Sequence, residues 1–195
     1  MKHRGITGLL AGVAAAVAVV AGCAPPNLAI GDSISVPIKD TAAVLVNASG
    51  GRTTYSAGHG PDRGSALEVA RDLAPNVKVR GWVIFEIGAN DVAVSHPDTY
   101  LRRVVDLVQA VPGDRCVAFV QVFRSSHAAN VEKWNLAFRT FLKTRPCWHE
   151  IRWGEAVRSN PRLILPDRPH PTEEGVRYLV DQYQLTATLP FGTRG

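Results

Sequence analysis

The sequence predicts an α/β protein built as a three-layer α/β/α sandwich around a parallel sheet of roughly five strands. Short apolar runs alternate along the chain with segments in which apolar residues recur every three or four positions. The short runs are continuously apolar, which indicates strands buried on both faces, as in parallel sheets. The longer segments have the period of helices that pack one face on such a sheet.

The predicted strands are apolar runs that stop at glycine or polar residues. They are residues 28–30, 43–46, 82–87 and 117–123, with a weaker fifth run at 151–153. The first three stop at Gly31-Asp32, Ser49-Gly50-Gly51 and Gly88. Since ligands in open parallel sheets collect at the carboxyl ends of the strands, these stops are where functional residues are expected.

The predicted helices have apolar faces within residues 67–74, 101–111, 131–142 and 176–183. Asp98 or Thr99 is placed to cap the second of them, and Thr172 precedes the last. Pro146 ends the third, because proline cannot continue a helix. Only a short helix fits between Ser33 and the second strand.

The amino-terminal segment has the pattern of a secretion signal. Lys2 and Arg4 precede a stretch, 6–21, that is uncharged and too short to span a membrane. It ends in Val20-Ala21-Gly22-Cys23, which resembles the processing box of bacterial lipoproteins. This resemblance implies cleavage before Cys23, acylation of its thiol and a lipid-anchored, extracytoplasmic protein on the bacterial cell membrane. The alternative is a simple signal peptide and a secreted protein.

We therefore expect a lipoprotein signal peptide at 1–22, an acylated cysteine with a short tether at 23–26, and one globular domain at 27–195. The chain has 195 residues, of which 46% are hydrophobic and 20% charged, as in ordinary globular domains. The net charge of +5 falls to +3 without the signal, because Lys2 and Arg4 leave with it. No basic stripe with interleaved aromatic residues occurs, so we expect no nucleic-acid partner.

Two cysteines remain after Cys23. In an oxidising compartment, Cys116 and Cys147 are expected to form a disulfide, which for a loop of about 30 residues would stabilise the fold by roughly 3–4 kcal/mol. The alternative is two free buried thiols. No Cys-x-x-Cys or His-x-x-x-His spacing occurs, so no metal site is predicted.

Four polar motifs follow strand ends or lie in the last loop. They are Gly31-Asp32-Ser33-Ile34-Ser35, Asn47-Ala48-Ser49-Gly50-Gly51-Arg52, Gly88-Ala89-Asn90-Asp91 and Pro166-Asp167-Arg168-Pro169-His170-Pro171. Their order and spacing resemble the SGNH (GDSL) hydrolase family over nearly the whole chain after the signal. The resemblance implies a flavodoxin-like fold and a serine esterase or acyltransferase activity without a cofactor.

The resemblance also assigns roles to individual residues. Ser33 would be the nucleophile, and His170 the base that removes its proton, because a serine hydroxyl attacks poorly without one. Asp167 would orient the imidazole and stabilise its charged form. The oxyanion hole would consist of the Ser33 and Gly51 backbone N–H groups and the Asn90 side-chain amide.

Several assignments have structural alternatives. Ser33 could be a helix N-cap, Asn90 a turn residue, and Asp167 and His170 ordinary loop residues. Asp32 is interpreted as a structural, loop-bonding carboxylate. Arg52 could bind an anionic or sugar substrate or simply be exposed, and His59 could line the site or be a solvated loop residue.

The subfamily stays open at this point. Gly51-Arg52-Thr53 resembles the corresponding run in peptidoglycan O-acetyltransferase catalytic domains, whereas a thioesterase-type spacing would give the second oxyanion role to the Arg52 amide. Gly88-Ala89-Asn90-Asp91 fits general hydrolases better.

The expected substrates are small acyl esters, acetyl esters above all, of envelope glycans or other small molecules, because no large insertion provides a lid for a long acyl chain. The alternatives are an O-acetyltransferase with the same triad and a catalytically inert envelope binding or scaffold lipoprotein, since a fold alone does not establish chemistry. We expect a monomer that meets the membrane through its lipid anchor.

Overall fold

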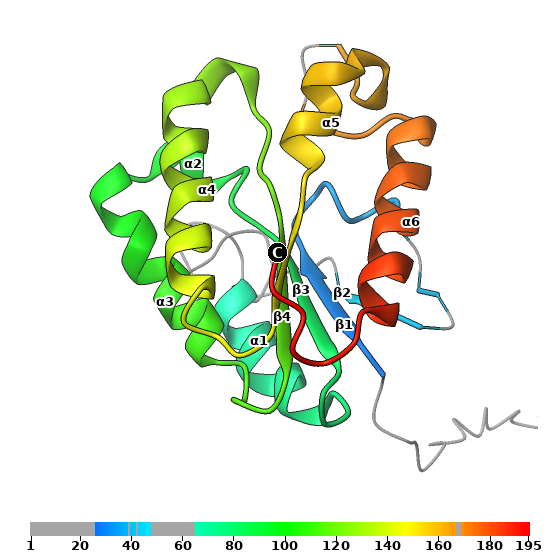
Figure 1. Cartoon of the computed structure of the whole chain (residues 1–195). Coiled ribbons are helices and arrows are strands. Elements are labelled where there is room, and N and C mark those ends of the chain that lie inside the picture. The colour runs from blue at the N-terminus through cyan, green and yellow to red at the C-terminus, as the bar shows by residue number, and fades with distance from the viewer. Residues whose placement is uncertain (1–25, 39, 42, 48–64, 167–168) are drawn as a thin grey trace, which may run out of the picture.

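The computed structural model describes residues 26–38, 40–41, 43–47, 65–166 and 169–195. Within them, five parallel strands form one sheet in the order β2-β1-β3-β4-β5 (Figure 1). The strands are β1 (Leu28–Gly31), β2 (Leu45–Asn47), β3 (Trp82–Glu86), β4 (Cys116–Val120) and β5 (Trp148–Ile151). The predicted α/β/α sandwich with a parallel five-stranded sheet is therefore confirmed.

The strand order reverses at β1, which lies between β2 and β3. Gly31, the last residue of β1, is in register with Glu86, the last residue of β3. The loops that leave these two neighbouring strands therefore begin side by side, at the point of a doubly wound sheet where ligands usually bind.

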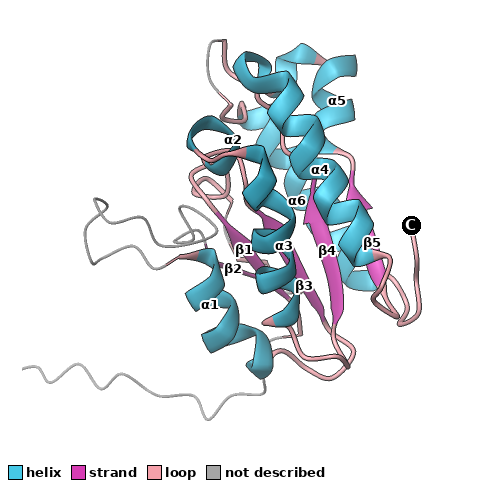
Figure 2. Ribbon diagram, turned by 90° about the vertical axis from the view of Figure 1, so that its left-hand side faces the viewer, coloured by secondary structure: helices cyan, strands magenta, loops and turns pink. Residues whose placement is uncertain are grey.

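Helices cover both faces of the sheet (Figures 1 and 2). One face carries α1 (Ala66–Leu73), α2 (Asp91–Val94), α3 (Tyr100–Gln109) and α4 (Ala128–Leu142), and the other carries α5 (Trp153–Ser159) and α6 (Glu173–Thr188). Short 3-10 turns occur at η1 (Ala74–Asn76), η2 (Pro97–Thr99), η3 (Ser125–His127) and η4 (Pro161–Leu163).

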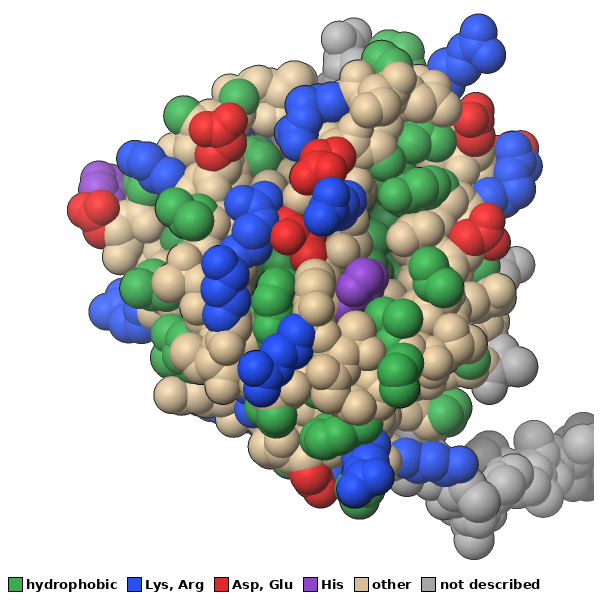
Figure 3. All heavy atoms as spheres, viewed as in Figure 1, with side chains coloured by type: hydrophobic (Ala, Val, Ile, Leu, Met, Phe, Trp, Pro, Cys, Tyr) green, Lys and Arg blue, Asp and Glu red, His purple; other side chains and the backbone are tan. Residues whose placement is uncertain are grey.

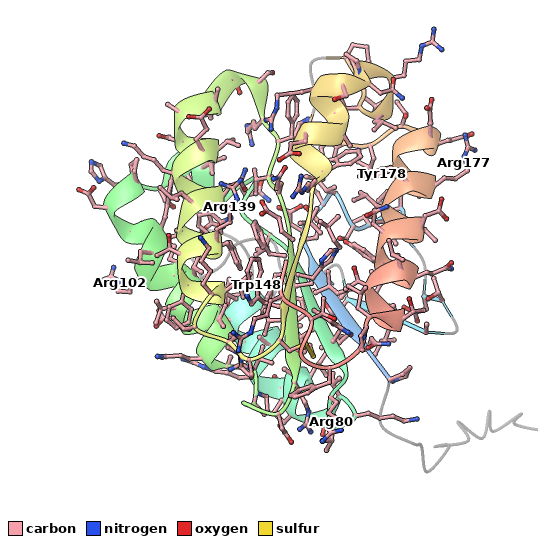
Figure 4. All side chains as sticks on the ribbon, viewed as in Figure 1. Arg80, Arg102, Arg139, Trp148, Arg177 and Tyr178 are labelled. Carbon is pink, nitrogen blue, oxygen red and sulfur yellow. A yellow bond between two sulfur atoms is a disulfide. The ribbon has the colours of Figure 1, made fainter. Side chains whose placement is uncertain are left out.

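Aromatic side chains fill both layers of the core. Phe138 of α4 stacks on Phe119 of β4, with ring centroids 4.8 Å apart. On the opposite face, Trp153 of α5 packs against Tyr178 of α6, with centroids 5.8 Å apart, and Figure 4 shows Tyr178 between these two helices. Since such rings bury large apolar areas, these contacts hold α4 on the sheet and α5 against α6.

The fifth strand begins three residues earlier than predicted and ends two residues earlier, at Trp148–Ile151 instead of 151–153. The weak apolar run at 151–153 is divided between two elements, because Ile151 ends the strand whereas Trp153 begins α5, a helix that the sequence analysis did not predict. The strand begins at Trp148 because residues 148–151 pair in parallel with residues 117–120 of β4. Residues near the carboxyl end of the chain also contact this strand, since the Trp148 N–H donates to the Thr193 carbonyl at 2.9 Å.

Other boundaries differ less. The second strand runs over Leu45–Asn47 rather than 43–46. Residues 32–37, where a short helix was expected, form successive turns. Thr99 does occupy the N-cap position of α3, but its side chain makes no capping hydrogen bond to that helix.

The predicted disulfide between Cys116 and Cys147 is confirmed. Both residues are fully buried, their Cα atoms are 4.8 Å apart, and the bond joins the start of β4 to the loop before β5. The cross-link therefore ties two neighbouring strands at their amino-terminal ends.

Charged side chains of both signs share the surface. On the face in Figure 3, Lys and Arg side chains lie among Asp and Glu side chains. Arg139 of α4, for example, pairs with Glu150 of β5 at 2.8 Å (Figure 4). Among the residues that the structure describes, no helix is both long and apolar enough to cross a membrane. The predicted signal and Cys23 lie outside those residues.

Candidate active site

Ser33 projects from a tight turn directly after β1. Its neighbours Asp32 and Ile34 are buried, whereas Ser33 is exposed. The turn is held by the Ser35 N–H, which donates to the Asp32 carbonyl at 3.1 Å, and by the Asp32 N–H, which donates to the Glu86 carbonyl at 3.2 Å. These bonds fix the turn on the sheet and leave the Ser33 hydroxyl accessible at its carboxyl edge.

His170 reaches the same place from the loop before α6. Its Nε2 atom lies 3.0 Å from Ser33 Oγ. The loop is pinned by two antiparallel bonds, from Leu165 N–H to the His170 carbonyl and from Thr172 N–H to the Leu163 carbonyl, both 2.9 Å long. The structure thus brings together a hydroxyl and an imidazole at a distance that permits proton transfer.

The Thr172 side chain anchors the other end of this loop. Its Oγ1 accepts from the Gly175 N–H and so caps α6. The same hydroxyl donates to the Arg162 carbonyl at 2.7 Å. Because one side chain holds both the helix start and the preceding segment, the position of His170 is tied to α6.

Asn90 lies in the loop after β3 and at the N-cap position of α2, where its side chain makes no capping bond. Instead, Asn90 Nδ2 donates to Asp32 Oδ2 at 3.3 Å. An amide nitrogen carries two hydrogens, and this bond uses one of them. The amide therefore faces the nucleophile turn, and this contact distinguishes Asn90 from an ordinary turn residue.

Three side chains from other elements hold the Asn90 loop. Trp134 Nε1 donates to the Ile87 carbonyl at 3.1 Å, and Arg124 Nη1 donates to the Ala89 carbonyl at 2.9 Å. Asn130 of α4 donates to the carbonyl of Val92 at 3.0 Å. These bonds fix the backbone on both sides of Asn90, as a pre-organised site requires.

Two carboxyl groups are buried beneath Ser33. Asp32 and Glu86 are 0% and 2% exposed. Burial, the largest cause, raises the pKa of Asp32 to about 7, and the charge of Asp91 adds to the rise while Arg124 opposes it. Burial and the nearby Asp32 also raise the pKa of Glu86 well above its usual range. The pair therefore retains a proton at a pH where exposed carboxyl groups have lost theirs.

Asp32 was interpreted from the sequence as structural, and it makes the loop bonds expected of such a residue. Its Oδ1 accepts from the Ile34 N–H at 3.0 Å, in addition to the bond from Asn90. Asp91 is fully buried and pairs with Arg103 of α3.

The remaining predicted site residues, Asp167, Gly51, Arg52 and His59, lie outside the described residues, and their roles stay predictions. In the part of the chain that the structure describes, no group of three or more His, Cys, Asp or Glu side chains is arranged to hold a metal ion.

Sequence reasoning missed two residues near the site, Glu86 and Arg124. A signal existed for Glu86, since it is an acidic residue in the otherwise apolar run of β3, Trp82–Glu86. An ionisable group buried in a sheet calls for a partner or a function. Arg124 follows β4 at the same edge of the sheet, but arginine in a loop carries no such signal.

Comparison with known proteins supports the fold. No protein-family model matches the sequence, and no curated protein matches it either. Among solved structures, the crystal structure of TesA matches with a TM-score of 0.59 and 15% identity, over 83% of this chain and 97% of that chain. The C-terminal catalytic domain of Streptococcus pneumoniae peptidoglycan O-acetyltransferase A (OatA), with a methylsulfonyl adduct, matches with a TM-score of 0.55 and 15% identity, over 89% of this chain and 100% of that chain. The chain has an SGNH hydrolase-like fold.

Proposed function

We propose that this protein is a serine esterase that cleaves small acyl esters through an acyl-serine intermediate. The observation that carries the proposal is the 3.0 Å approach of His170 Nε2 to an exposed Ser33 hydroxyl at the carboxyl edge of the sheet. The SGNH hydrolase-like fold and the Asn90 amide beside the same turn support it.

In the first half of the reaction, Ser33 Oγ attacks the acyl carbonyl carbon while its proton moves to His170 Nε2. The negative charge that forms on the carbonyl oxygen would be stabilised by the Ser33 N–H, the Gly51 N–H and the Asn90 amide; one such donor is typically worth about 3–4 kcal/mol. The tetrahedral intermediate then collapses, and the alcohol leaves with the proton from His170.

In the second half, water attacks the acyl group on Ser33 while His170 takes a proton from it. Collapse releases the carboxylic acid and returns the proton to Ser33 Oγ. Asp167 would hold the imidazole in the required tautomer throughout. No cofactor is needed, since every proton and acyl transfer is performed by these side chains.

A fluorophosphonate probe tests the nucleophile. The full chain is expected to be labelled at Ser33, and Ser33→Ala is expected to take no label. The melting temperature of this variant should equal that of the wild type, which shows that it is folded. If correctly folded protein takes no label, the protein is not a serine hydrolase, and the inert scaffold lipoprotein becomes the better description.

The proposed substrates are acetyl or similarly small esters of envelope glycans or other small molecules. The support is the short connection from Ser33 to β2, in which the described residues form turns rather than a large insertion. Hydrolysis of 4-nitrophenyl acetate should therefore be faster than hydrolysis of the corresponding long-chain ester. A strong preference for the long chain would reject the small-acyl assignment.

A second candidate function is acetyl transfer to a sugar hydroxyl, which would replace water in the second half-reaction. The similarity in fold to the OatA catalytic domain favours it, as does the sequence Gly51-Arg52-Thr53. Product analysis with and without a glycan acceptor distinguishes the two, because a transferase yields acetylated acceptor at the expense of free acetate.

We also place the protein outside the cytoplasm, attached to the membrane through acylated Cys23. The support is the sequence of residues 1–23 alone. Metabolic labelling with a fatty acid should mark the protein, and Cys23→Ala should abolish the label. A labelled Cys23→Ala variant would contradict the anchor.

A further inference from the structure

A buried chain of polar groups runs beneath Ser33 and links the elements that carry the site. At its centre, Asp32 directly follows β1 and Glu86 ends the neighbouring strand β3, and their carboxyl groups share a hydrogen bond. The surrounding space is full, since a Cβ atom on Gly31 would come within 3.2 Å of Glu86 Oε2. Small changes in either carboxyl group are therefore transmitted to its neighbours.

Asp32 acts on both sides of the site with separate oxygens. Oδ1 accepts from the Ile34 N–H of the nucleophile turn at 3.0 Å, and Oδ2 accepts from the Asn90 amide at 3.3 Å. An ionised carboxylate offers acceptors only, whereas a protonated one or an amide would present a hydrogen to one of these partners. The two bonds are best satisfied when Asp32 is ionised.

Glu86 sits behind Asp32 and suits the opposite state. Its Oε2 accepts from Ser35 Oγ at 3.0 Å, and Ser35 Oγ lies 3.5 Å from the hydroxyl of Tyr183, a fully buried residue of α6. Two carboxylates in contact in a buried site cannot both remain charged at low cost. A proton on Glu86 removes that repulsion and becomes a hydrogen-bond donor to Asp32.

The groups that face the pair come from four places in the fold, and two of these groups are charged. Asp91 of α2 faces Asp32 and disfavours its charge, whereas Arg124, after β4, favours it. Tyr183 of α6 faces both carboxyl groups, and burial raises the pKa of its hydroxyl well above the usual range, so it stays neutral. Ser35 belongs to the nucleophile turn itself. Because one neighbour is positive and the other negative, they do not balance two negative charges on the pair. A proton on Glu86 therefore removes the second negative charge.

We propose that Glu86 is a positioning residue for the reaction at Ser33: as a neutral acid it donates to Asp32, which then holds both the Ile34 N–H of the nucleophile turn and the Asn90 amide of the oxyanion hole. This inference rests on the proposed esterase function. Glu86 does not touch the Ser33 hydroxyl; it acts through Asp32 and through its bond to Ser35, which lies in the nucleophile turn.

Two substitutions at Glu86 separate its hydrogen bonds from its bulk. Glu86→Gln has the same size, can donate to Asp32 through its amide and can accept from Ser35 through its carbonyl. Glu86→Leu fills similar space with no polar group. With 4-nitrophenyl acetate and the full chain, we expect Glu86→Leu to lower kcat by at least about tenfold with little change in KM, and Glu86→Gln to recover kcat to within about threefold of the wild type. Equal kcat in all three proteins would overturn the proposal.

A double-mutant cycle shows whether the effect passes through Asn90. If it does, Glu86→Leu lowers kcat by a smaller factor in an Asn90→Ala background than in the wild type, because the amide to be positioned is already absent. A general loss of stability would lower kcat by the same factor in both backgrounds. The same factor would therefore reject the positioning role.

Should Glu86→Leu fail to fold, Asp32→Asn takes its place, since its amide keeps the shape but cannot accept from both Ile34 and Asn90. Unchanged kcat in folded Asp32→Asn would overturn the proposal. The Asn90 side-chain amide resonance provides a readout that needs no activity: it should shift in Glu86→Leu and stay in place in Glu86→Gln.

These results distinguish the two levels of inference. If the wild type hydrolyses no ester and Ser33 takes no probe, the proposed esterase function fails. If the wild type is active through Ser33 but neither the Asn90 resonance nor kcat changes in Glu86→Leu, only the positioning role fails.

Discussion

His170 Nε2 lies 3.0 Å from Ser33 Oγ, although 137 positions of sequence separate the two residues. Ser33 is placed by the end of β1, whereas His170 is placed by the loop that precedes α6, a helix that packs on one face of the sheet. The sheet therefore serves as the common frame for two side chains that share no local structure.

Removing either member of the Ser33–His170 pair should abolish most of the esterase activity. We expect Ser33→Ala and His170→Ala each to lower kcat by at least about 10³-fold, and the double variant to be little worse than either, because residues that act as a unit lose their effect together. Steady-state hydrolysis of 4-nitrophenyl acetate measures this.

The matched control for that experiment is Ser126→Ala. Ser126 Oγ also lies close to an imidazole, 2.8 Å from His127 Nδ1, but this exposed pair belongs to η3. Its removal should leave kcat unchanged. Equal losses at Ser33 and Ser126 would mean that serine–histidine contact alone does not identify the reacting residue.

The disulfide should contribute substantially to stability. It closes a loop of 31 residues between Cys116 and Cys147. In the chain-entropy model its loss costs about 3–4 kcal/mol of unfolding free energy. Urea unfolding with and without a reducing agent measures the difference. In a Cys116→Ser, Cys147→Ser double variant, the reducing agent should not change the free energy of unfolding. No effect of reductant on the wild type would show that the bond does not form in solution.

The buried carboxyl pair makes stability depend on pH in a defined direction. Glu86 has a raised pKa in the folded protein, so the folded chain keeps a proton that the unfolded chain releases. Its contribution is complete below the unfolded pKa and is lost as pH rises toward the folded pKa. Wild type should therefore lose stability relative to Glu86→Gln by up to about 1.4 kcal/mol per pH unit above about pH 4.5.

Urea unfolding of both proteins between about pH 5 and about pH 7 tests this dependence, since the window begins near the unfolded pKa of a glutamate. Glu86→Gln is the control for the wild type, because its amide has no proton to release in this pH range. Parallel stability curves for the two proteins would indicate that Glu86 is ionised in the folded state.

Gly88 should tolerate no side chain. Its φ of +122° lies in the region that favours glycine, and a Cβ atom there would come within 2.2 Å of Trp134 Nε1. Gly88→Ala is expected to cost about 2–4 kcal/mol of unfolding free energy through backbone strain and overpacking. It should also lower kcat, because Gly88 lies in the loop that carries Asn90.

The control is Gly113→Ala, where a Cβ atom would meet nothing within 4 Å. Thermal unfolding of both variants gives the comparison. Similar melting temperatures for the two would show that the Trp134 contact does not constrain Gly88.

Several features were predictable because they are local. The ends of β1 and β3 follow from apolar runs that stop at Gly31 and Gly88, and these stops place Ser33 and Asn90 at one edge of a parallel sheet. The start of α6 follows from Thr172 and the helical period after it. Each of these signals lies within a few neighbouring residues, where backbone preference and hydrophobic periodicity operate.

Other features could not be predicted because they depend on distant partners. The boundaries of β5 are set by its pairing with β4, in which Trp148 lies opposite Val117 and Ile151 opposite Val120. The helix α5 has only seven residues, too few for a periodic signal. Glu86 looks like a polar break in a strand until Asp32 and Ser35 are placed beside it.

The sequence by itself determined the class of fold, the order of its elements and the residue types available at each strand end, because hydrophobic period and chain punctuation are properties of short segments. Only the tertiary structure decided which of those residues meet. The approach of His170 to Ser33, and the proton-bearing Glu86 behind Asp32, arise when strands and loops far apart in the chain are packed side by side and water is excluded between them. Burial gives a carboxyl group its unusual proton affinity, and burial is created by neighbours that a linear sequence does not identify.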